Sequence, residues 1–516
     1  MARWDHGYIT DVAYTTNAYH EASPCWLATC ARLLGFRTPD LAAPFRYADL
    51  GCGNGLGVLI AAATNPHADF YGCDFNPSHI ENARALAAQA KLTNVRFEEV
   101  SFEELAKGGG SAGEDFDFLV AHGVLSWVSL ENRLYLTTAI GRLLRPGGLA
   151  MVSYNTTPGW SGVEPIRLLM RQLVEADHRR TDLAAVDTFR VLDQLRTGGA
   201  AFFRAQPGLE ARLAQMRTMD PRYIAHEFLN RDWHPVMFAE VAESMVETKM
   251  TYIGSATLME NLDVVSVQEA ILPLLNATPD LATRETIRDL AIAKTFRRDL
   301  WRKGSEPMLV PEHMVALDAL TLAWTGKAVE AEVTFPGPLG TITGQAEFYH
   351  PVIEALRHGP VTLAELRTLP VLQNRQMAEF IQAAMLLLGG GFAYAVSPHG
   401  TRPEVRESAR RLNGAIVNRL RVGVDVRRLA APLNGSFLDV DVIEALVIGR
   451  LLDGGSHDPE GLIDAVLNDV LRSGRSLLRD GQPLQEPGAA RVLIGETVRV
   501  VLERRFQLLR DMGMIG

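Results

Sequence analysis

Residues 47–55 read Tyr-Ala-Asp-Leu-Gly-Cys-Gly-Asn-Gly and lead into an apolar run from Leu56 to Ala63. The pattern predicts a buried strand that ends in a glycine turn and opens directly into a helix. Such a turn lets a ligand approach the backbone where no Cβ is in the way. A dinucleotide-binding turn would need its third glycine at position 56 or 58, where this chain has Leu56 and Val58. The spacing therefore argues against a nicotinamide or flavin dinucleotide.

Size and charge narrow the class of protein. The chain has 516 residues, 51 of them basic and 61 acidic, which gives a net charge of −10. This length predicts two to four domains, and the acidic balance argues against nucleic acid as a partner. The N-terminus lacks a signal pattern and no stretch predicts a membrane span, so we expect a cytoplasmic protein that does not bind membranes. The four cysteines include no C-x-x-C pair, so no disulfide framework and no metal site are expected.

Apolar strands and amphipathic helices alternate regularly around the glycine turn. Strands are predicted over residues 45–51, 69–75, 95–100, 116–123 and 149–155. Continuous apolar strands separated by helices predict a parallel sheet covered on both faces, which is an α/β, Rossmann-like fold. Ligands of such sheets bind at the carboxyl ends of the strands. The residues that follow each strand are therefore the candidates for a binding site.

Each predicted strand end carries a distinctive side chain. Asp74, after the second strand, is placed to accept hydrogen bonds from a ribose diol, although an acid there would also suit the dipole of the next helix. Ser101 follows the third strand, where a side chain would contact an adenine. His122 ends the fourth strand, either as a site residue or as a hydrogen-bonded structural residue. Tyr154 and Asn155 end the fifth strand.

Four stretches together resemble one family: 48–55 (ADLGCGNG), 72–75 (GCDF), 121–128 (AHGVLSWV) and 154–160 (YNTTPGW). They are similar to class I S-adenosylmethionine-dependent methyltransferases that carry a methyltransferase regulatory domain, a group that includes rickettsial lysine methyltransferases of outer-membrane protein. The resemblance continues in 225–230 (AHEFLN), 254–256 (GSA) and 296–301 (FRRDLW). It weakens after residue 340.

The resemblance implies S-adenosyl-L-methionine as cofactor and assigns roles to individual residues. The residues implied to hold the cofactor are Asp49, Gly51, Gly53, Gly55, Asp74, Phe75, Ser101, His122 and Gly123. Those implied to contact the acceptor are Tyr14, Trp127, Asn155 and Trp160, with Tyr154 and His122 as catalytic candidates. Ser101 departs from the family, which usually has an acid there. Tyr14 belongs to an aromatic N-terminal segment that we interpret as a flap over the ligand.

The family reaction is attack of a nucleophile on the sulfonium methyl group. The absence of Asp/Asn-Pro-Pro-Tyr after the fourth strand argues against methylation of DNA bases, and no adjacent acid pair lies there to hold a divalent metal. We expect a protein lysine methyltransferase. The alternatives are a small-molecule N- or O-methyltransferase and a regulatory protein that binds S-adenosylmethionine without catalysis. The methyl acceptor is accordingly a protein or a small molecule.

Six regions follow from the composition and the periodicity. They are a cofactor-binding core with its flap (1–160), a helical insertion (161–222), the completion of the core sheet (223–265), a helical regulatory domain (266–343), a winged-helix-like module (344–400) and a helical C-terminal domain (401–516). The insertion is predicted to be a lid, or, by resemblance, a homodimer contact. Within 266–343, the basic run from Lys294 to Lys303 predicts a solvated, ion-paired helix.

Overall fold

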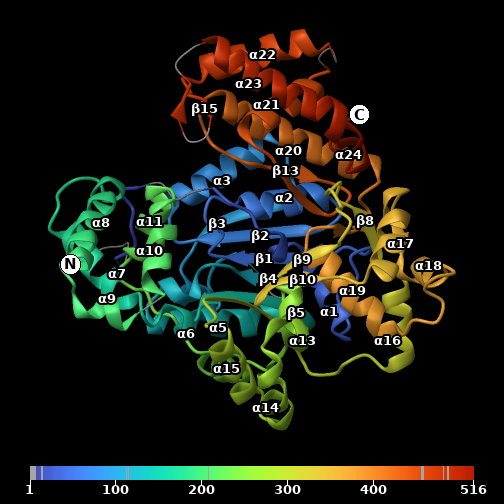
Figure 1. Cartoon of the computed structure of the whole chain (residues 1–516), viewed down its shortest axis with the longest axis horizontal. Helices are drawn as coiled ribbons and strands as arrows, with labels where there is room; N and C mark the ends of the chain where they lie inside the picture. Colours follow the sequence, from blue (N-terminus) through green and yellow to red (C-terminus); the bar gives the residue numbers. More distant parts are fainter. Residues whose placement is uncertain are drawn as a thin grey trace.

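A seven-stranded sheet occupies the centre of the computed structural model (Figure 1). The structure describes residues 7–12, 16–111, 113, 115–206, 208–454, 458–479, 482–484 and 487–516. The strand order is β3-β2-β1-β4-β5-β7-β6, with β7 antiparallel to both neighbours. The predicted α/β, Rossmann-like class is therefore confirmed. Since the strand order reverses direction between β1 and β4, the crevice for a ligand is expected at their carboxyl ends.

The strands and helices of this core follow the predicted alternation. The strands are β1 (Arg46–Leu50), β2 (Asp69–Asp74), β3 (Val95–Glu99), β4 (Phe116–Ala121), β5 (Leu144–Asn155), β6 (Met250–Ser255) and β7 (Phe296–Lys303). The helices that accompany them are α1 (Pro24–Leu33), α2 (Leu56–Thr64), α3 (Pro77–Gln89), α4 (Phe102–Ala106), α5 (Leu130–Leu143), α12 (Phe238–Glu247), α13 (Asp263–Ser266), α14 (Leu272–Ala277) and α15 (Leu281–Ala291).

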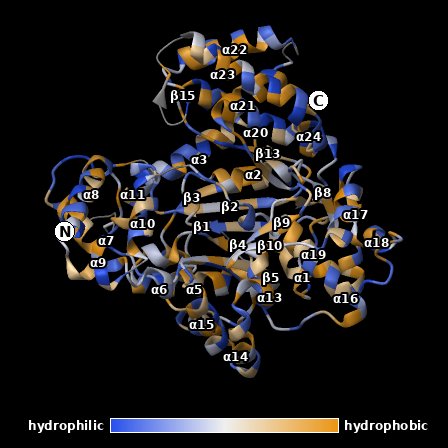
Figure 2. Cartoon of the chain, viewed as in Figure 1, coloured by the Kyte–Doolittle hydropathy of each residue, from blue (hydrophilic) through white to orange (hydrophobic). Residues whose placement is uncertain are grey.

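Helix α2 begins immediately after the glycine turn and is apolar along its whole length (Figure 2). Its N-cap is Gly55, whose φ of 72° lies in the left-handed region that favours glycine. A Cβ at Gly55 would lie 2.7 Å from atoms of Ala83 and Phe97, so any side chain at this position would clash with them. An all-round apolar helix is stable only if it is covered on all sides. The sheet covers one side of α2 and the C-terminal region covers the other.

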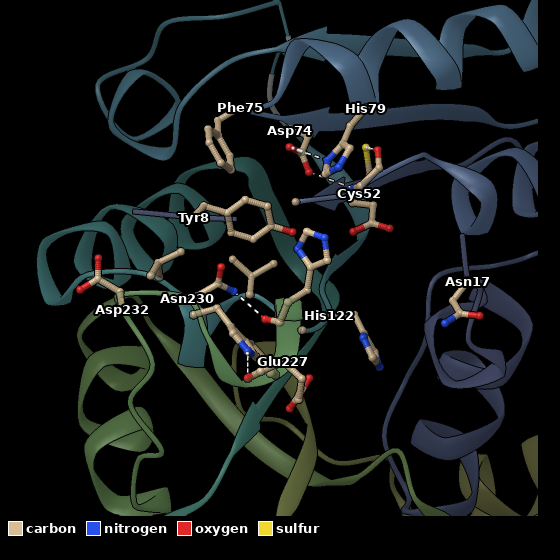
Figure 3. A pocket seen from close by; sticks show the side chains of 18 of the residues that line it. Tyr8, Asn17, Cys52, Asp74, Phe75, His79, His122, Glu227, Asn230 and Asp232 are labelled. Atoms are coloured by element: carbon tan, nitrogen blue, oxygen red, sulfur yellow. Dashed lines mark hydrogen bonds and ion pairs between the residues drawn. The ribbon is translucent and has the colours of Figure 1, made fainter. Parts of the chain in front are cut away.

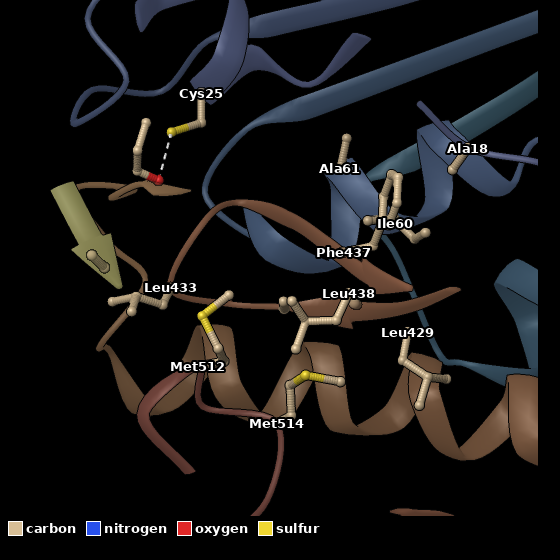
Figure 4. Packing of buried hydrophobic residues seen from close by; sticks show 14 of the residues in the cluster. Ala18, Cys25, Ile60, Ala61, Leu429, Leu433, Phe437, Leu438, Met512 and Met514 are labelled. Atoms are coloured by element: carbon tan, nitrogen blue, oxygen red, sulfur yellow. Dashed lines mark hydrogen bonds between the residues drawn. The ribbon is translucent and has the colours of Figure 1, made fainter. Parts of the chain in front are cut away.

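The C-terminal region packs onto the core through a β-hairpin. Phe437 and Leu438 of this hairpin belong to the same buried cluster as Ile60 and Ala61 of α2 (Figure 4). Met512, close to the end of the chain, belongs to it as well. The first and last thirds of the sequence therefore share one hydrophobic core.

A helical insertion lies between β5 and α12, at one side of the sheet (Figure 1). Its helices are α6 (Thr157–Trp160), α7 (Glu164–Glu175), α8 (Thr181–Thr197), α9 (Ala201–Ala205), α10 (Leu209–Arg217) and α11 (Pro221–Phe228). They have a hydrophobic cluster of their own, in which Trp160, Phe228 and Trp233 are buried.

The prediction of a solvated helix over the basic run from Lys294 to Lys303 is wrong, because residues 296–303 form β7 inside the core sheet. Alternate side chains of a strand point to opposite faces, and Arg297 points into the protein with only 4% of its surface exposed. Its guanidinium pairs with Glu285 at 2.9 Å, Asp289 at 2.6 Å and Asp299 at 2.9 Å. Two of these partners lie on helix α15, and their association with the strand cannot be seen in the local sequence. The helical domain predicted over 266–343 is therefore interrupted by a strand of the core.

The remaining elements follow β7. They are α16 (Val310–Asp318), β8 (Thr321–Trp324), β9 (Thr334–Gly337), β10 (Gly340–Thr343), α17 (Ala346–Arg357), β11 (Val361–Thr362), α18 (Leu363–Arg367), α19 (Met377–Gly389), β12 (Ala393–Ala395), α20 (Pro403–Arg421), β13 (Arg428–Ala431), β14 (Ser436–Asp439), α21 (Val442–Leu452), α22 (Pro459–Arg472), β15 (Leu478–Arg479), β16 (Gln482–Pro483), α23 (Pro487–Val500) and α24 (Phe506–Asp511). Short 3-10 segments, among them η1 (His20–Ala22) and η2 (Leu125–Trp127), occur elsewhere in the chain.

Two features of this region differ from the prediction. The sheet beside α17, α18 and α19 has the order β11-β8-β12, so its central strand comes from before residue 344. The C-terminal domain is not helical throughout, since β13 and β14 form a hairpin with its turn at residues 432–435. Gly435 has a φ of 61° in this turn. Among the described residues, no helix is long and apolar enough to cross a bilayer, and no cluster of three or more potential metal ligands occurs.

Candidate active site

A cavity of about 730 Å³ opens at the carboxyl ends of the parallel strands (Figure 3). The glycine turn after β1, Asp74 at the end of β2 and His122 after β4 all line it. The side of the cavity opposite the glycine turn is formed by the N-terminal segment and by helix α11. The cavity thus lies at the reversal of strand order, where ligands of open α/β sheets bind.

The glycine turn forms the floor of the cavity. Gly51 and Gly53 line it, and a Cβ placed on Gly53 would meet no atom within 4 Å, so its backbone is open to a ligand. Asp49 lines the cavity just before the turn. Burial and the negative charge of Asp74 raise the pKa of Asp49 to about 7. Two carboxyl groups that are buried together favour a ligand with positive charge.

Asp74 is fixed by three contacts at the start of α3. One carboxylate oxygen accepts a hydrogen bond from the Gly53 N–H at 3.0 Å, and the other accepts one from the Asn76 N–H at 2.9 Å. The ring of His79 lies 3.2 Å from the same oxygen as Asn76. The carboxylate oxygen that Gly53 contacts can accept a further bond, so the predicted role toward a ribose is chemically available. The next residue, Phe75, also lines the cavity and meets the Tyr8 ring edge to face at 5.6 Å.

Ser101 lines the cavity but its side chain is engaged in a helix cap. Its hydroxyl donates to Glu104 at 2.8 Å and accepts from the Glu104 backbone N–H, which makes a capping box at the start of α4. The predicted adenine contact by Ser101 would therefore have to involve its remaining lone pair. Val100 and Phe102 on either side supply apolar surface to the cavity.

His122 is half-buried under the N-terminal segment. Its ring stacks on Tyr19 with centroids 3.8 Å apart and 17° between the planes. Burial and the charge of Arg298 lower the pKa of His122 to about 3, so the ring is neutral at physiological pH. Its Nε2 atom is buried without a hydrogen-bond partner among the described residues. Gly123, which follows it, lines the cavity and has a φ of 66°.

The side of the cavity opposite the glycine turn is aromatic and acidic. The indole N–H of Trp127 donates to the backbone oxygen of Glu227 at 3.2 Å, and the amide of Asn155 donates to the Glu227 carboxylate at 3.2 Å. Trp160 contributes its ring, over which the guanidinium of Arg212 lies at 4.7 Å. Trp127, Asn155 and Trp160 thus all line the cavity, and their contact with the acceptor stays a prediction.

Two predicted residues, Tyr154 and Gly55, lie away from the cavity. The structure does not bring Tyr154 to the cavity: the side chain is completely buried, and its hydroxyl donates to Asp299 at 2.5 Å. Successive strand residues alternate between faces, so Tyr154 faces away from the site that Asn155 reaches. Gly55 caps α2 and does not line the cavity. Tyr14 lies outside the described residues.

Helix α11 and the N-terminal segment supply residues that the sequence analysis did not assign. Tyr223, His226, Glu227 and Asn230 come from or follow α11, and all line the cavity. The stretch 225–230 contributed to the family resemblance, and that resemblance was the only sign in the sequence that these residues belong to the site. No motif around them predicted a role for any single residue. Asn230 accepts a hydrogen bond from the Ile9 N–H at 2.9 Å, and the His226 ring bonds the Val12 carbonyl at 2.9 Å. These bonds hold the N-terminal segment over the cavity.

Comparison with known proteins agrees with this geometry. Residues 44–180 match the model of a methyltransferase domain, and residues 220–303 match a predicted methyltransferase regulatory domain. An uncharacterized protein of Synechocystis is 32% identical over 486 residues, which is 93% of this chain and 94% of that protein. A trans-aconitate 2-methyltransferase of Methylobacterium nodulans is 31% identical over 150 residues, 29% of this chain and 52% of that enzyme.

A solved structure has the same fold over nearly the whole chain. PKMT2 from Rickettsia typhi in complex with AdoHcy superposes with a TM-score of 0.71 at 20% identity, covering 97% of this chain and 99% of that one. Because it covers 97% of this chain, the match includes the insertion and the C-terminal region. The segment matched by the regulatory model supplies both β6 and β7 to the core sheet and the residues of α11 to the cavity.

The residues present fit the cofactor of this family. The open backbone at Gly53, the acids Asp49 and Asp74, and the apolar surface of Phe75 and Phe102 suit a nucleoside with a positively charged amino-acid tail. The chain belongs to the class I S-adenosylmethionine-dependent methyltransferases that carry a methyltransferase regulatory domain, and its methyl donor is S-adenosylmethionine.

Proposed function

We propose that this enzyme methylates the amine of lysine side chains in a protein. The observation that carries the proposal is the composition of the acceptor side of the cavity. It combines aromatic rings, from Tyr19, Trp127 and Trp160, with the carboxylate of Glu227. Aromatic faces and a carboxylate attract a cationic side chain. The likeness in fold to PKMT2 over the whole chain gives further support for a protein acceptor.

The chemistry requires an amine that has lost its proton and is aligned with the methyl group. S-adenosylmethionine supplies an electrophilic methyl group on a positively charged sulfur. The enzyme's residues have to orient the acceptor and exclude water, because in-line attack depends on positioning more than on a strong catalytic group. Burial between Trp127 and Tyr19 would disfavour the ammonium form and lower the pKa of a lysine. The neutral ring of His122 adds no charge that would repel the cofactor.

A small-molecule carboxylate is the second candidate acceptor, favoured by Arg212. This guanidinium lines the cavity above Trp160, and no carboxylate of the described residues lies within 4.0 Å of it. Guanidinium groups bind carboxylates strongly, and the relative from Methylobacterium nodulans is a trans-aconitate methyltransferase. The similarity to that relative covers only 29% of this chain, and therefore lends less support than the acceptor side does.

The helical insertion is a proposed dimer contact. Leu183 and Val186 lie one turn apart on α8 and are 53% and 48% exposed. Neighbouring apolar side chains on a helix surface are typical of interaction sites. Replacing both with glutamate should give a monomer in sedimentation velocity experiments if this face joins two copies, and an unchanged sedimentation coefficient would refute the contact.

The acceptor class can be tested by transfer of a labelled methyl group. The enzyme is incubated with methyl-labelled S-adenosylmethionine and, separately, with a protein extract and a small-molecule extract of the source cells. Acid hydrolysis of the labelled protein should give labelled methyl-lysine. Label in small carboxylate esters alone would refute the lysine proposal and support the Arg212 alternative.

A further inference from the structure

Glu227 is a carboxylate with no positive partner among the described residues. It lies on α11, one turn after Tyr223, and faces the cavity (Figure 3). The amide of Asn155 donates a hydrogen bond to its carboxylate at 3.2 Å, and the hydroxyl of Tyr223 also favours the ionised form by lowering the pKa of Glu227. Among the described residues, no lysine, arginine or histidine nitrogen lies within 4.0 Å of it. Both donors are neutral, so they orient the carboxylate but leave its charge uncompensated.

A buried carboxylate without a counter-ion is costly, and proteins usually pair it or bond it fully. Two neutral donors do not fill the four acceptor positions of a carboxylate. The open side of Glu227 points into the cavity, where the acceptor side is otherwise formed by Tyr19, Trp127 and Trp160. The site is therefore built for a cation that arrives from outside the chain.

We infer that Glu227 binds the ammonium group of the acceptor lysine and takes its proton before methyl transfer, with Tyr223 and Asn155 as positioning residues. This assignment rests on the proposed amine acceptor. It makes Glu227 a catalytic residue, because its carboxylate would contact the reacting nitrogen.

The proton and electron balance of this step is simple. The ammonium gives one proton to the Glu227 carboxylate, and its nitrogen keeps the electron pair. That pair forms the bond to the methyl carbon while the carbon–sulfur bond breaks and sulfur keeps its electrons. The products are a methylated ammonium, S-adenosylhomocysteine and a protonated Glu227, which returns its proton to water. No oxidant, reductant or metal is required.

Four other ionisable groups of the cavity are less suited to this role. Asp74 is held by two backbone N–H groups at the cofactor side, and Asp49 lies beside it. His122 is close enough to Arg298 for that charge to oppose protonation, and its ring is covered by Tyr19. The charge of Arg298 would therefore repel a cation next to His122. Asp232 lies within 3.6 Å of Arg231 and His234 and is thereby partly compensated.

The local environment of Glu227 also suits proton transfer. Burial raises the pKa of its carboxyl group to about 7, and the bonds from Asn155 and Tyr223 limit the shift. A base with a pKa near the working pH is present in its reactive form and can still accept a proton. The carboxylate fraction rises with pH, so methyl transfer should rise between pH 6 and pH 8.

Substitution of Glu227 tests the assignment. Glu227→Gln keeps the size and the bond to Asn155 but removes the charge and the basic site. We expect kcat for lysine methylation to fall about 100-fold to 10,000-fold, as for loss of a general base, and the rise between pH 6 and pH 8 to disappear. Affinity for S-adenosylhomocysteine, measured by calorimetry, should stay within about threefold, which shows that the variant is folded.

Two further variants complete the experiment. Glu243→Gln, on the exposed face of α12, is the matched control and should leave both the rate and its pH profile unchanged. Tyr223→Phe should lower kcat less than Glu227→Gln and shift the pH profile upward, because one bond that stabilises the carboxylate is lost. Equal rates and identical pH profiles for the wild type and Glu227→Gln would overturn the assignment.

The same assay separates failure of this inference from failure of the proposed function. Labelled methyl-lysine formed at equal rates by the wild type and Glu227→Gln would leave the lysine function standing and refute the role of Glu227. Label from the wild type only in other acceptors, or none at all, would refute the lysine function and this role with it.

Discussion

The ring of Tyr19 stacks on the ring of His122, with centroids 3.8 Å apart and 17° between the planes. The N-terminal segment thereby closes over the end of β4, where the cofactor side of the cavity meets the acceptor side. The next two residues contact other parts of the protein. The ring of His20 forms a hydrogen bond with Ser436 at 3.0 Å, and the carboxylate of Glu21 lies 3.5 Å from the guanidinium of Arg298. One short turn therefore links the cavity to the C-terminal region.

Removing the Tyr19 ring should loosen this closure. Stacked aromatic pairs contribute about 0.5–1.5 kcal/mol beyond their buried area, so we expect Tyr19→Ala to weaken binding of S-adenosylhomocysteine by a free energy in that range. Calorimetric titration measures it. Tyr19→Phe retains the stacked ring and should bind like the wild type. Equal affinity of Tyr19→Ala and Tyr19→Phe would show that the stack does not cover the ligand.

Asp74 should contribute directly to cofactor binding. Deleting a charged hydrogen-bond partner costs about 1–3 kcal/mol, and Asp74→Ala should weaken S-adenosylmethionine binding by that amount in calorimetry. The control is Asp69→Ala at the exposed opposite end of the same strand, which should have no effect. Unchanged affinity of Asp74→Ala would mean that the ribose binds elsewhere.

Arg297 should be essential to folding and not to chemistry. Its loss would leave Glu285, Asp289 and Asp299 buried without their shared counter-ion. Breaking a buried ion pair from one side costs about 3–5 kcal/mol, so Arg297→Met should lower the free energy of unfolding by that much in a denaturant titration. Arg302→Met, on the same strand and without a carboxylate within 4.0 Å among the described residues, should cost under about 1 kcal/mol. Similar losses for the two variants would contradict the role of the ion-pair cluster.

Tyr154→Phe distinguishes a structural from a catalytic tyrosine. The hydroxyl bonds buried Asp299, and hydrogen bonds to charged groups contribute about 1.5–3 kcal/mol. We expect lower stability in thermal unfolding but an unchanged kcat at a temperature where both proteins are folded. A large fall in kcat with unchanged stability would restore the catalytic role that the sequence predicted.

Glu227→Gln should stabilise the protein at neutral and alkaline pH. Burial raises the pKa of Glu227 to about 7 in the folded state, against about 4.3 when unfolded. Between these values the folded state binds more protons, so stability falls as pH rises through that window. The variant lacks this penalty, and at pH 8 its free energy of unfolding should exceed that of the wild type by about 1–3 kcal/mol, with no difference at pH 4. Matching denaturation curves at both pH values would show that the carboxylate is not buried.

Local patterns explain why much of the cofactor side was predictable. The turn at Gly51 to Gly55 and Asp74 at the end of β2 depend on strand and helix signals within a few residues, and strand ends of a parallel sheet meet at one edge. The same logic placed His122, Trp127 and Asn155 beside the cavity. It failed for Tyr154, because a residue's face on a strand changes with a shift of one position.

The amino-acid sequence by itself determined the class of the fold, the edge of the sheet where the ligand binds and the residues of the glycine turn, since these follow from local hydrophobic period and backbone freedom. Only the tertiary structure decided that Arg297 lies in a central strand and that Glu227 faces the site. Arg297 is stable there because acids from another helix neutralise it. Glu227 meets Asn155 across 72 residues of chain. Burial and pairing between distant segments set the charge of each group, and no local pattern records that pairing.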